Sequence, residues 1–198
     1  MADLWLYENE EKAKGHTLIC GIDEAGRGPL AGPVYAAAVI LPENADLPGL
    51  NDSKKLTAKK RDILYDLIRE KAVAYCIAFA DEKEIDDINI LNAAMLAMRR
   101  AEEGLSVKPE LALVDGNRDP GLDIPTRTIV KGDALSASIA AASILAKVAR
   151  DRFMDKMDEQ YPEYQFKKHK GYPTALHYEL LAKYGPCPIH RRSFRLVK

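Results

Sequence analysis

An apolar run meets two adjacent carboxylates and a glycine-flanked arginine in the stretch Ile19-Cys20-Gly21-Ile22-Asp23-Glu24-Ala25-Gly26-Arg27-Gly28-Pro29. Residues 17–22 are typical of a buried strand that ends on Asp23 and Glu24. Because neighbouring side chains in a strand point to opposite faces, both acids reach one site only if the strand ends or distorts there. The two glycines that follow permit such a change of direction. The stretch therefore predicts either a site for hard cations and phosphates or a solvated loop with exposed acids.

The composition is that of a soluble globular protein, with 198 residues of which 47% are hydrophobic and 30% charged. That length suffices for one well-buried domain, with room for a small appended lobe. No apolar run approaches the roughly 20 residues that span a bilayer, and the N-terminus lacks the pattern of a signal peptide. Cys20, Cys76 and Cys187 match neither a zinc spacing nor a disulfide framework. We therefore expect a cytoplasmic, monomeric protein with no membrane partner.

Hydrophobic periodicity predicts strands that alternate with helices. We expect strands at 17–22, 34–41, 72–80, 111–114 and 126–130, and helices at 57–71, 88–103, 134–157 and 174–184. Thr57 and Asp133 are expected to cap helices at their N-termini, and Gly104 to close one at its C-terminus. The pattern predicts an α/β catalytic domain over residues 1–160 and a helical substrate-binding segment over 161–198.

Two further carboxylates stand in positions that match those of Asp23 and Glu24. Asp115 follows the short buried strand at 111–114, and Asp133 begins a long helix. A turn and an N-cap are the alternative interpretations of these two residues. If the four converge, they would repel one another without a cation. Two Mg²⁺ ions ~4 Å apart would relieve the repulsion and clamp the attacking and leaving oxygens at a phosphorus.

Basic residues gather where a polyanion could be held, although the net charge of the chain is only −1. From residue 164 to 198 there are eight Lys or Arg against the single acid Glu179, with aromatic residues between them. Lys54 and Lys55 crowd the entry to the predicted helix at 57–71, where they could hold backbone phosphates. Solvated surface lysines remain the alternative. This distribution favours a nucleic acid as partner.

Several motifs, in order along the chain, closely resemble those of the bacterial ribonuclease HII family. They are Gly21-Ile22-Asp23-Glu24-Ala25-Gly26-Arg27-Gly28-Pro29-Leu30-Ala31-Gly32-Pro33-Val34, Asn51-Asp52-Ser53-Lys54-Lys55-Leu56, Val114-Asp115-Gly116-Asn117, Lys131-Gly132-Asp133, Ala141-Ala142-Ser143-Ile144-Leu145-Ala146-Lys147, His169-Lys170-Gly171-Tyr172-Pro173-Thr174 and His190-Arg191-Arg192-Ser193-Phe194. The resemblance implies a ribonuclease H-like fold, with a mixed five-stranded sheet flanked by helices and a small C-terminal helical lobe. It also implies an endonuclease that cuts the RNA strand of RNA–DNA hybrids. Such an enzyme nicks DNA duplexes 5′ to an embedded ribonucleotide and leaves 3′-hydroxyl and 5′-phosphate ends.

The resemblance also implies roles for particular residues. The metal ligands and catalytic carboxylates would be Asp23, Glu24, Asp115 and Asp133, holding two Mg²⁺ or Mn²⁺ ions, with Asp23 as the bridging ligand. The residues that bind substrate would be Gly26, Arg27, Gly28 and Tyr172, together with Lys54 and Lys55. The tripeptide would read the 2′-hydroxyl through its backbone, and the tyrosine would pack on the ribose.

Two other functions stay open at this point. A nuclease of the same fold could use the acidic cluster on DNA, in which case it would depend on neither the tripeptide nor the tyrosine and would cleave all-DNA duplex. A catalytically silent module could bind hybrids without cutting them. Such a module is expected to have lost at least one of the four carboxylates, and all four are present.

Overall fold

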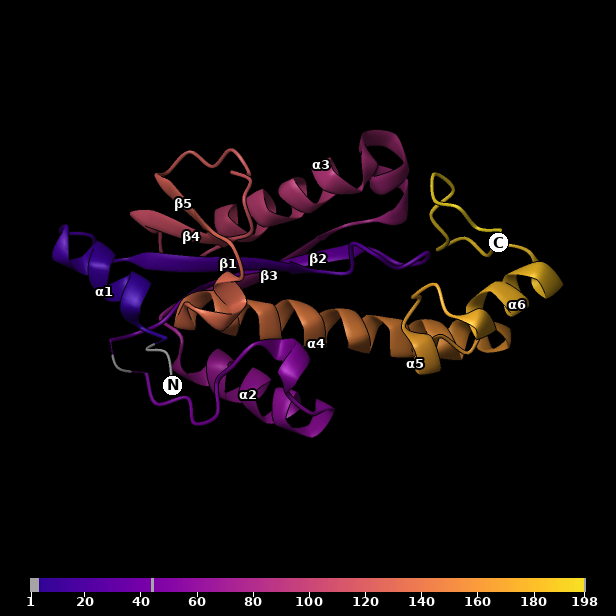
Figure 1. Cartoon of the computed structure of the whole chain (residues 1–198), viewed down its shortest axis with the longest axis horizontal. Helices are drawn as coiled ribbons and strands as arrows, with labels where there is room; N and C mark the ends of the chain where they lie inside the picture. The colour runs from indigo at the N-terminus through magenta and orange to yellow at the C-terminus, as the bar shows by residue number, and fades with distance from the viewer. Residues whose placement is uncertain (1–3, 44, 198) are drawn as a thin grey trace.

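A mixed five-stranded sheet runs through the centre of the molecule (Figure 1). The computed structural model describes residues 4–43 and 45–197. The strands lie in the order β3-β2-β1-β4-β5 and are β1 (Ile19–Ala25), β2 (Val34–Ile40), β3 (Ala74–Ala80), β4 (Leu111–Asp115) and β5 (Thr126–Ile129). β2 is antiparallel to both of its neighbours, whereas β4 is parallel to β1 and to β5. The mixed five-stranded sheet that the motifs implied is confirmed.

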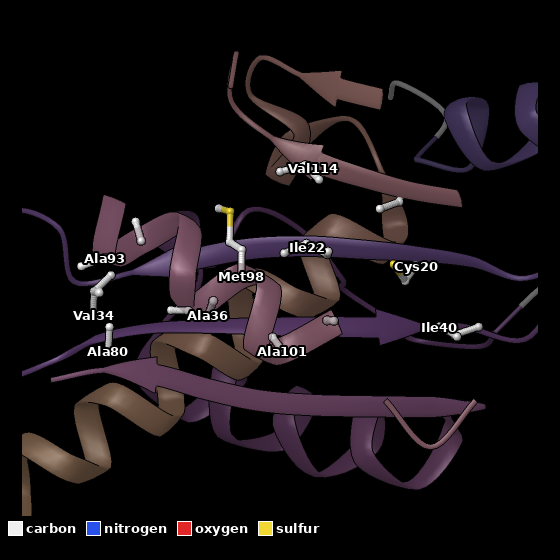
Figure 2. Packing of buried hydrophobic residues seen from close by; sticks show 14 of the residues in the cluster. Cys20, Ile22, Val34, Ala36, Ile40, Ala80, Ala93, Met98, Ala101 and Val114 are labelled. Carbon is white, nitrogen blue, oxygen red and sulfur yellow. The ribbon is translucent and has the colours of Figure 1, made fainter. Parts of the chain in front are cut away.

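Helices cover both faces of this sheet, α3 on one and α2 with α4 on the other (Figure 1). The helical elements are α1 (Leu6–Ala13), η1 (Ser53–Lys55), α2 (Ala58–Lys71), α3 (Glu82–Glu103), η2 (Gly132–Ala134), α4 (Ala137–Gln160), η3 (Pro162–Tyr164), α5 (Phe166–His169) and α6 (Ala175–Tyr184). Figure 2 shows Met98 of α3 beside Ile22 of β1, in a buried cluster that also includes Ala101 of α3. Within the described ranges, no helix combines the length and hydrophobicity needed to cross a bilayer.

Three predicted boundaries are wrong, each for a local reason. β1 does not end on the carboxylates, because Asp23 and Glu24 still pair with β2. α3 starts at Glu82, where Asp81 and Glu84 form a capping box, and a kink at Asn89 (φ 65°) begins its second part close to the predicted start at 88. The N-cap of α4 is Ser136, whose hydroxyl accepts from the backbone of Ile139. Asp133, predicted to be that cap, instead lies in the turn η2.

α4 packs very closely against β1, because the contact surface consists of small residues. A Cβ atom added at Gly21 would lie 2.1 Å from the backbone carbon of Ser138. No side chain fits there without moving the helix away from the sheet. This close approach places the first half of α4 directly beneath the strand that carries Asp23.

The C-terminal segment packs on the far end of α4 (Figure 1). It contains three buried histidines. The backbone N–H of Cys187 donates to Nδ1 of His190 (3.0 Å), so His190 carries its proton on Nε2 and donates it to Nε2 of His177 (3.0 Å). His177 is thereby left to donate from Nδ1 to the carbonyl of Tyr172 (3.0 Å). His169 stacks on His177 at 4.3 Å between ring centroids. This series of hydrogen bonds forms only while the rings of His177 and His190 are neutral.

Acidification should therefore destabilise the protein as the pH falls from about 6.5 towards 4. Burial lowers the pKa of His177 and of His190 to about 4, and it also lowers the pKa of His169. Between the unfolded value of ~6.5 and pH 4 the unfolded chain binds protons that the folded chain does not. Stability is thus complete above pH 6.5 and falls by a few kcal/mol towards pH 4. Urea unfolding from pH 7.5 to pH 4.5 measures this.

The charged neighbours of these rings are Arg192, which faces His190, and Asp158, which faces His169. A His177→Asn variant retains a donor near the Nδ1 position and removes one titrating ring. Its free energy of unfolding should fall less steeply with acid than that of the wild type. If the free energy of unfolding fell equally steeply with acid in both proteins, His177 would not contribute to this pH dependence.

Candidate active site

Two carboxylates lie side by side on neighbouring parallel strands, on the face covered by α2 and α4. Asp23 is opposite Ala37, a residue of the core beneath α2 and α4, whereas Glu24 is opposite Ala36 of the core beneath α3. Ile22 pairs with Val114, so the next residues along, Asp23 and Asp115, are neighbours as well. The undistorted strand therefore sends Asp23 and Glu24 to opposite faces, with Asp115 beside Asp23.

Asp23 and Asp115 bear an electrostatic strain that neighbouring donors only partly relieve. Burial, followed by the charges of Glu24 and Asp115, raises the pKa of Asp23 well above its usual value. Burial and the charge of Asp133 raise the pKa of Asp115. The hydroxyl of Ser143 and the amide of Glu24 donate to Asp23, the latter at 2.7 Å. The charges of the four carboxylates thus act on one another.

Lys54 supplies the nearest opposing charge at this cluster. Its Nζ donates to Oδ2 of Asp133 at 3.1 Å. Partial burial acts to lower the pKa of Lys54, but the hydrogen bond to Asp133 and the charges of Asp133 and Asp23 outweigh it and raise the value. Lys55, predicted beside it, turns instead towards Asp52 at 3.9 Å.

A hollow of about 210 Å³ lies beside the carboxylates and brings several predicted residues together. Its lining comprises Glu24, Ala25, Gly26, Arg27, Ser53, Lys54, Ser143, Lys147 and Tyr172. A second, smaller hollow joins Glu24 to Asp115 and to the turn that follows it. Lys55 lines neither.

The glycine tripeptide and the predicted tyrosine meet on one side of this hollow. A Cβ added at Gly28 would lie 3.8 Å from Cε1 of Tyr172, whose side chain is 39% exposed. Arg27 donates from Nη1 to Oε1 of Glu24 at 3.2 Å, which ties the tripeptide to the carboxylates. Lys147 lies over the ring of Tyr172, 5.9 Å from its centroid. Ribose-sized space is therefore bordered by an aromatic face, cations and backbone.

Three side chains that line the hollow were not predicted from the sequence: Ser53, Ser143 and Lys147. The hydroxyls of Ser53 and Ser143 lie 2.9 Å apart and link η1 to α4 beneath Asp23. Ser143 and Lys147 are four residues apart and therefore lie on one face of α4. Both belong to the motif Ala141 to Lys147, and their spacing of four residues is the feature of the sequence that could have indicated a shared site.

The donor set suits a hard divalent cation, although the carboxylates are not already arranged as ligands. In the described part of the chain, no three His, Cys, Asp or Glu side chains are positioned to hold a metal ion. Yet Asp23 and Asp115 are buried or half-buried, repel one another and face one ammonium group. Carboxylate oxygens with unrelieved negative charge are the donors that Mg²⁺ and Mn²⁺ prefer.

Comparison with known proteins identifies the family. The family described as Ribonuclease HII matches residues 20–197. The chain belongs to the ribonuclease HII family. A ribonuclease HII from Dechloromonas aromatica (strain RCB) is 62% identical over 177 residues, which cover 89% of this chain and 90% of that protein. Another, from Caldicellulosiruptor bescii (strain ATCC BAA-1888 / DSM 6725 / KCTC 15123 / Z-1320), is 54% identical over 190 residues, 95% of this chain and 92% of that one. The chain is therefore an endoribonuclease.

Solved structures of the wider group share this architecture. The ribonuclease H2 from Pyrococcus horikoshii OT3 superposes with a TM-score of 0.76 at 31% identity, over 91% of this chain and 95% of that chain. Bst-RNase HIII in complex with Mn²⁺ superposes with a TM-score of 0.68 at 19% identity, over 86% of this chain and 64% of that chain. The second likeness concerns the fold alone. The ribonuclease H-like fold is confirmed.

Removal of Asp23, the most buried carboxylate of this cluster, should stabilise the metal-free protein. Asp23→Asn keeps the shape of the side chain and removes a charge that burial and Asp115 disfavour at pH 7. We expect the free energy of unfolding to rise by about 1–3 kcal/mol, measured by thermal unfolding in a metal chelator. Asp151→Asn, which removes the partner of Lys147 on α4, is the control and should give no gain. A less stable Asp23→Asn variant would contradict the repulsion argued for this cluster.

Proposed function

We propose that this chain hydrolyses the RNA strand of RNA–DNA hybrids and nicks duplex DNA 5′ to single embedded ribonucleotides, leaving 3′-hydroxyl and 5′-phosphate ends. The observation that carries the proposal is the shared hollow. Its lining includes Glu24, which lies close to the other carboxylates, together with Gly26 and Arg27 of the tripeptide and Tyr172. Groups suited to phosphodiester hydrolysis thus lie beside groups suited to contact a ribose.

We assign the metal-binding role to Asp23, Glu24, Asp115 and Asp133. Two divalent ions, Mg²⁺ or Mn²⁺, bound by these oxygens would supply Lewis-acid stabilisation of charge on the attacking and leaving oxygens. Asp23 is the natural shared ligand, because it is the carboxylate on which both Glu24 and Asp115 act. Lys54 is bound to Asp133 and is exposed over most of its length, so it can swing to a phosphate oxygen when a cation takes its place.

We assign substrate recognition to the tripeptide, to Tyr172 and to the residues around them. The 2′-hydroxyl is the group that distinguishes one ribonucleotide from the surrounding DNA. Glycine lets the backbone approach that hydroxyl, and Gly28 faces Tyr172 across the space that a sugar would occupy. Lys147 borders the same space and is suited to a phosphate. The segment 161–198, which carries the tyrosine, would act as the substrate-binding part of a monomer.

Cleavage of a labelled DNA duplex with one ribonucleotide tests the reaction and the substrate together. We expect a single nick directly 5′ to the ribonucleotide that depends on Mg²⁺ or Mn²⁺ and is abolished by Asp23→Asn. The all-DNA duplex of the same sequence is the control and should stay intact. Cleavage of that control would favour a DNA nuclease of the same fold, and binding without cleavage would indicate a silent module.

Tyr172 should contribute most to kcat/KM on a duplex that carries a single ribonucleotide. We expect Tyr172→Ala to lower kcat/KM on a single embedded ribonucleotide by about 10–100-fold, because stacking is worth about 1–3 kcal/mol. The loss on a long RNA–DNA hybrid should be smaller, since neighbouring riboses offer other registers. Tyr172→Phe, which keeps the ring, separates stacking from the hydroxyl. An equal loss on both substrates would contradict this role.

A further inference from the structure

Arg191 and Arg150 are fully buried, and both bind the loop at 26–33 through its carbonyl oxygens. Arg191 donates to the carbonyls of Gly26 (2.6 Å), Arg27 (3.0 Å), Pro29 (2.7 Å) and Gly32 (2.8 Å). Arg150 donates to those of Ala31 (3.1 Å), Pro33 (3.2 Å) and Lys170 (3.1 Å). Within the described ranges, neither guanidinium forms an ion pair with a carboxylate. Backbone oxygens thus replace the counter-ion of two buried cations.

Such an arrangement is costly, which argues that it serves a purpose besides packing. Burial, followed by the charge of Arg150, lowers the pKa of Arg191 to about 9. A buried charge without an ionic partner persists only when its donors are satisfied. Arg191 meets that condition by directing its fork of N–H groups at four carbonyls of one loop. A guanidinium can do so because its donors are fixed in a plane.

The carbonyls held by Arg191 determine where the neighbouring amides point. In a planar trans peptide the N–H points opposite to the C=O. The carbonyl of Gly26 and the N–H of Arg27 belong to one peptide group, and the carbonyl of Arg27 and the N–H of Gly28 belong to the next. Since both carbonyls point inward to Arg191, both N–H groups point away from it.

In this loop, the amides of Arg27 and Gly28 combine an N–H without an acceptor among the described residues with an exposed position. The N–H of Leu30 donates to Gly171 and that of Gly32 donates to Ile189, both at 2.8 Å. The N–H groups of Arg27 and Gly28 donate to no acceptor in the described part of the chain. Arg27 and Gly28 are also the exposed residues of the stretch 26–33, whose other members are buried.

We propose that Arg191 is a positioning residue for ribose recognition, which holds the carbonyls of Gly26 and Arg27 so that the amides of Arg27 and Gly28 donate to the 2′-hydroxyl oxygen of the substrate. This rests on the proposed function and adds the residue that sets its specificity. Lysine in place of Arg191 would keep the charge, but a single ammonium cannot bridge the same four carbonyls. The loop would then lose its fixed direction while the carboxylates stay in place.

Binding of two duplexes tests the proposal. One carries a single ribonucleotide, the other is all DNA of the same sequence, and divalent ions are left out to prevent cleavage. We expect the wild type to prefer the first by about tenfold, the value of one lost hydrogen bond, and Arg191→Lys to lose most of that preference. Met98→Ala is the matched control, because Met98 of α3 is buried in a core cluster that contains no residue of the loop. It should lower the melting temperature and keep the preference.

An Arg191→Lys variant that keeps the wild-type preference overturns the proposal. A wild type without any preference counts against ribose reading by the proposed function itself, so the two failures are distinct. If the variant does not fold, amide NMR of the wild type gives the answer. The N–H signals of Arg27 and Gly28 should shift with the ribonucleotide duplex and not with the DNA duplex, while that of Leu30, already bonded, stays. Equal shifts with both duplexes overturn the proposal.

Discussion

The close contact between α4 and β1 is the constraint on which the site depends. Gly21 lets the backbone of the helix approach the strand until no Cβ would fit, which fixes the helix along the sheet. Ser143, Lys147 and Arg150 follow at spacings of four and three residues and so share one face of α4. They reach Asp23, the ring of Tyr172 and the loop at 26–33, respectively. One rigid helix thereby aligns the carboxylates, the aromatic wall and the backbone that borders the hollow.

The negative and the positive charges near the site are both costly to bury in the folded protein. Asp23 and Asp115 repel one another, whereas Arg150 and Arg191 are buried and form no ion pair with a carboxylate among the described residues. The carbonyl oxygens of the loop at 26–33 offset part of the cost of burying the two guanidinium groups. Tight apolar packing elsewhere, such as the cluster around Met98, contributes the folding stability that offsets the cost of these buried charges.

Most elements, and the four carboxylates, could be predicted from the sequence, because hydrophobic periodicity and short polar motifs are local signals. The end of β1 could not be predicted, since the pairing of Asp23 with Ala37 extends the strand beyond its apolar run. The cap of α4 was misplaced because Asp133 and Ser136 are both good N-caps, and tertiary contacts choose between them. Whether the carboxylates hold ions stays a prediction.

Arg191 shows why the remaining part of the site lies beyond sequence patterns. Its basic neighbours suggested a surface that meets a polyanion, yet its guanidinium is buried and binds backbone 165 residues earlier in the chain. A bond of that span carries a large loop-closure cost and forms only after sheet and helix have come together. The direction of two amides near the start of the chain is therefore set by a side chain near its end. No local propensity encodes such a dependence, because it exists only in the folded molecule.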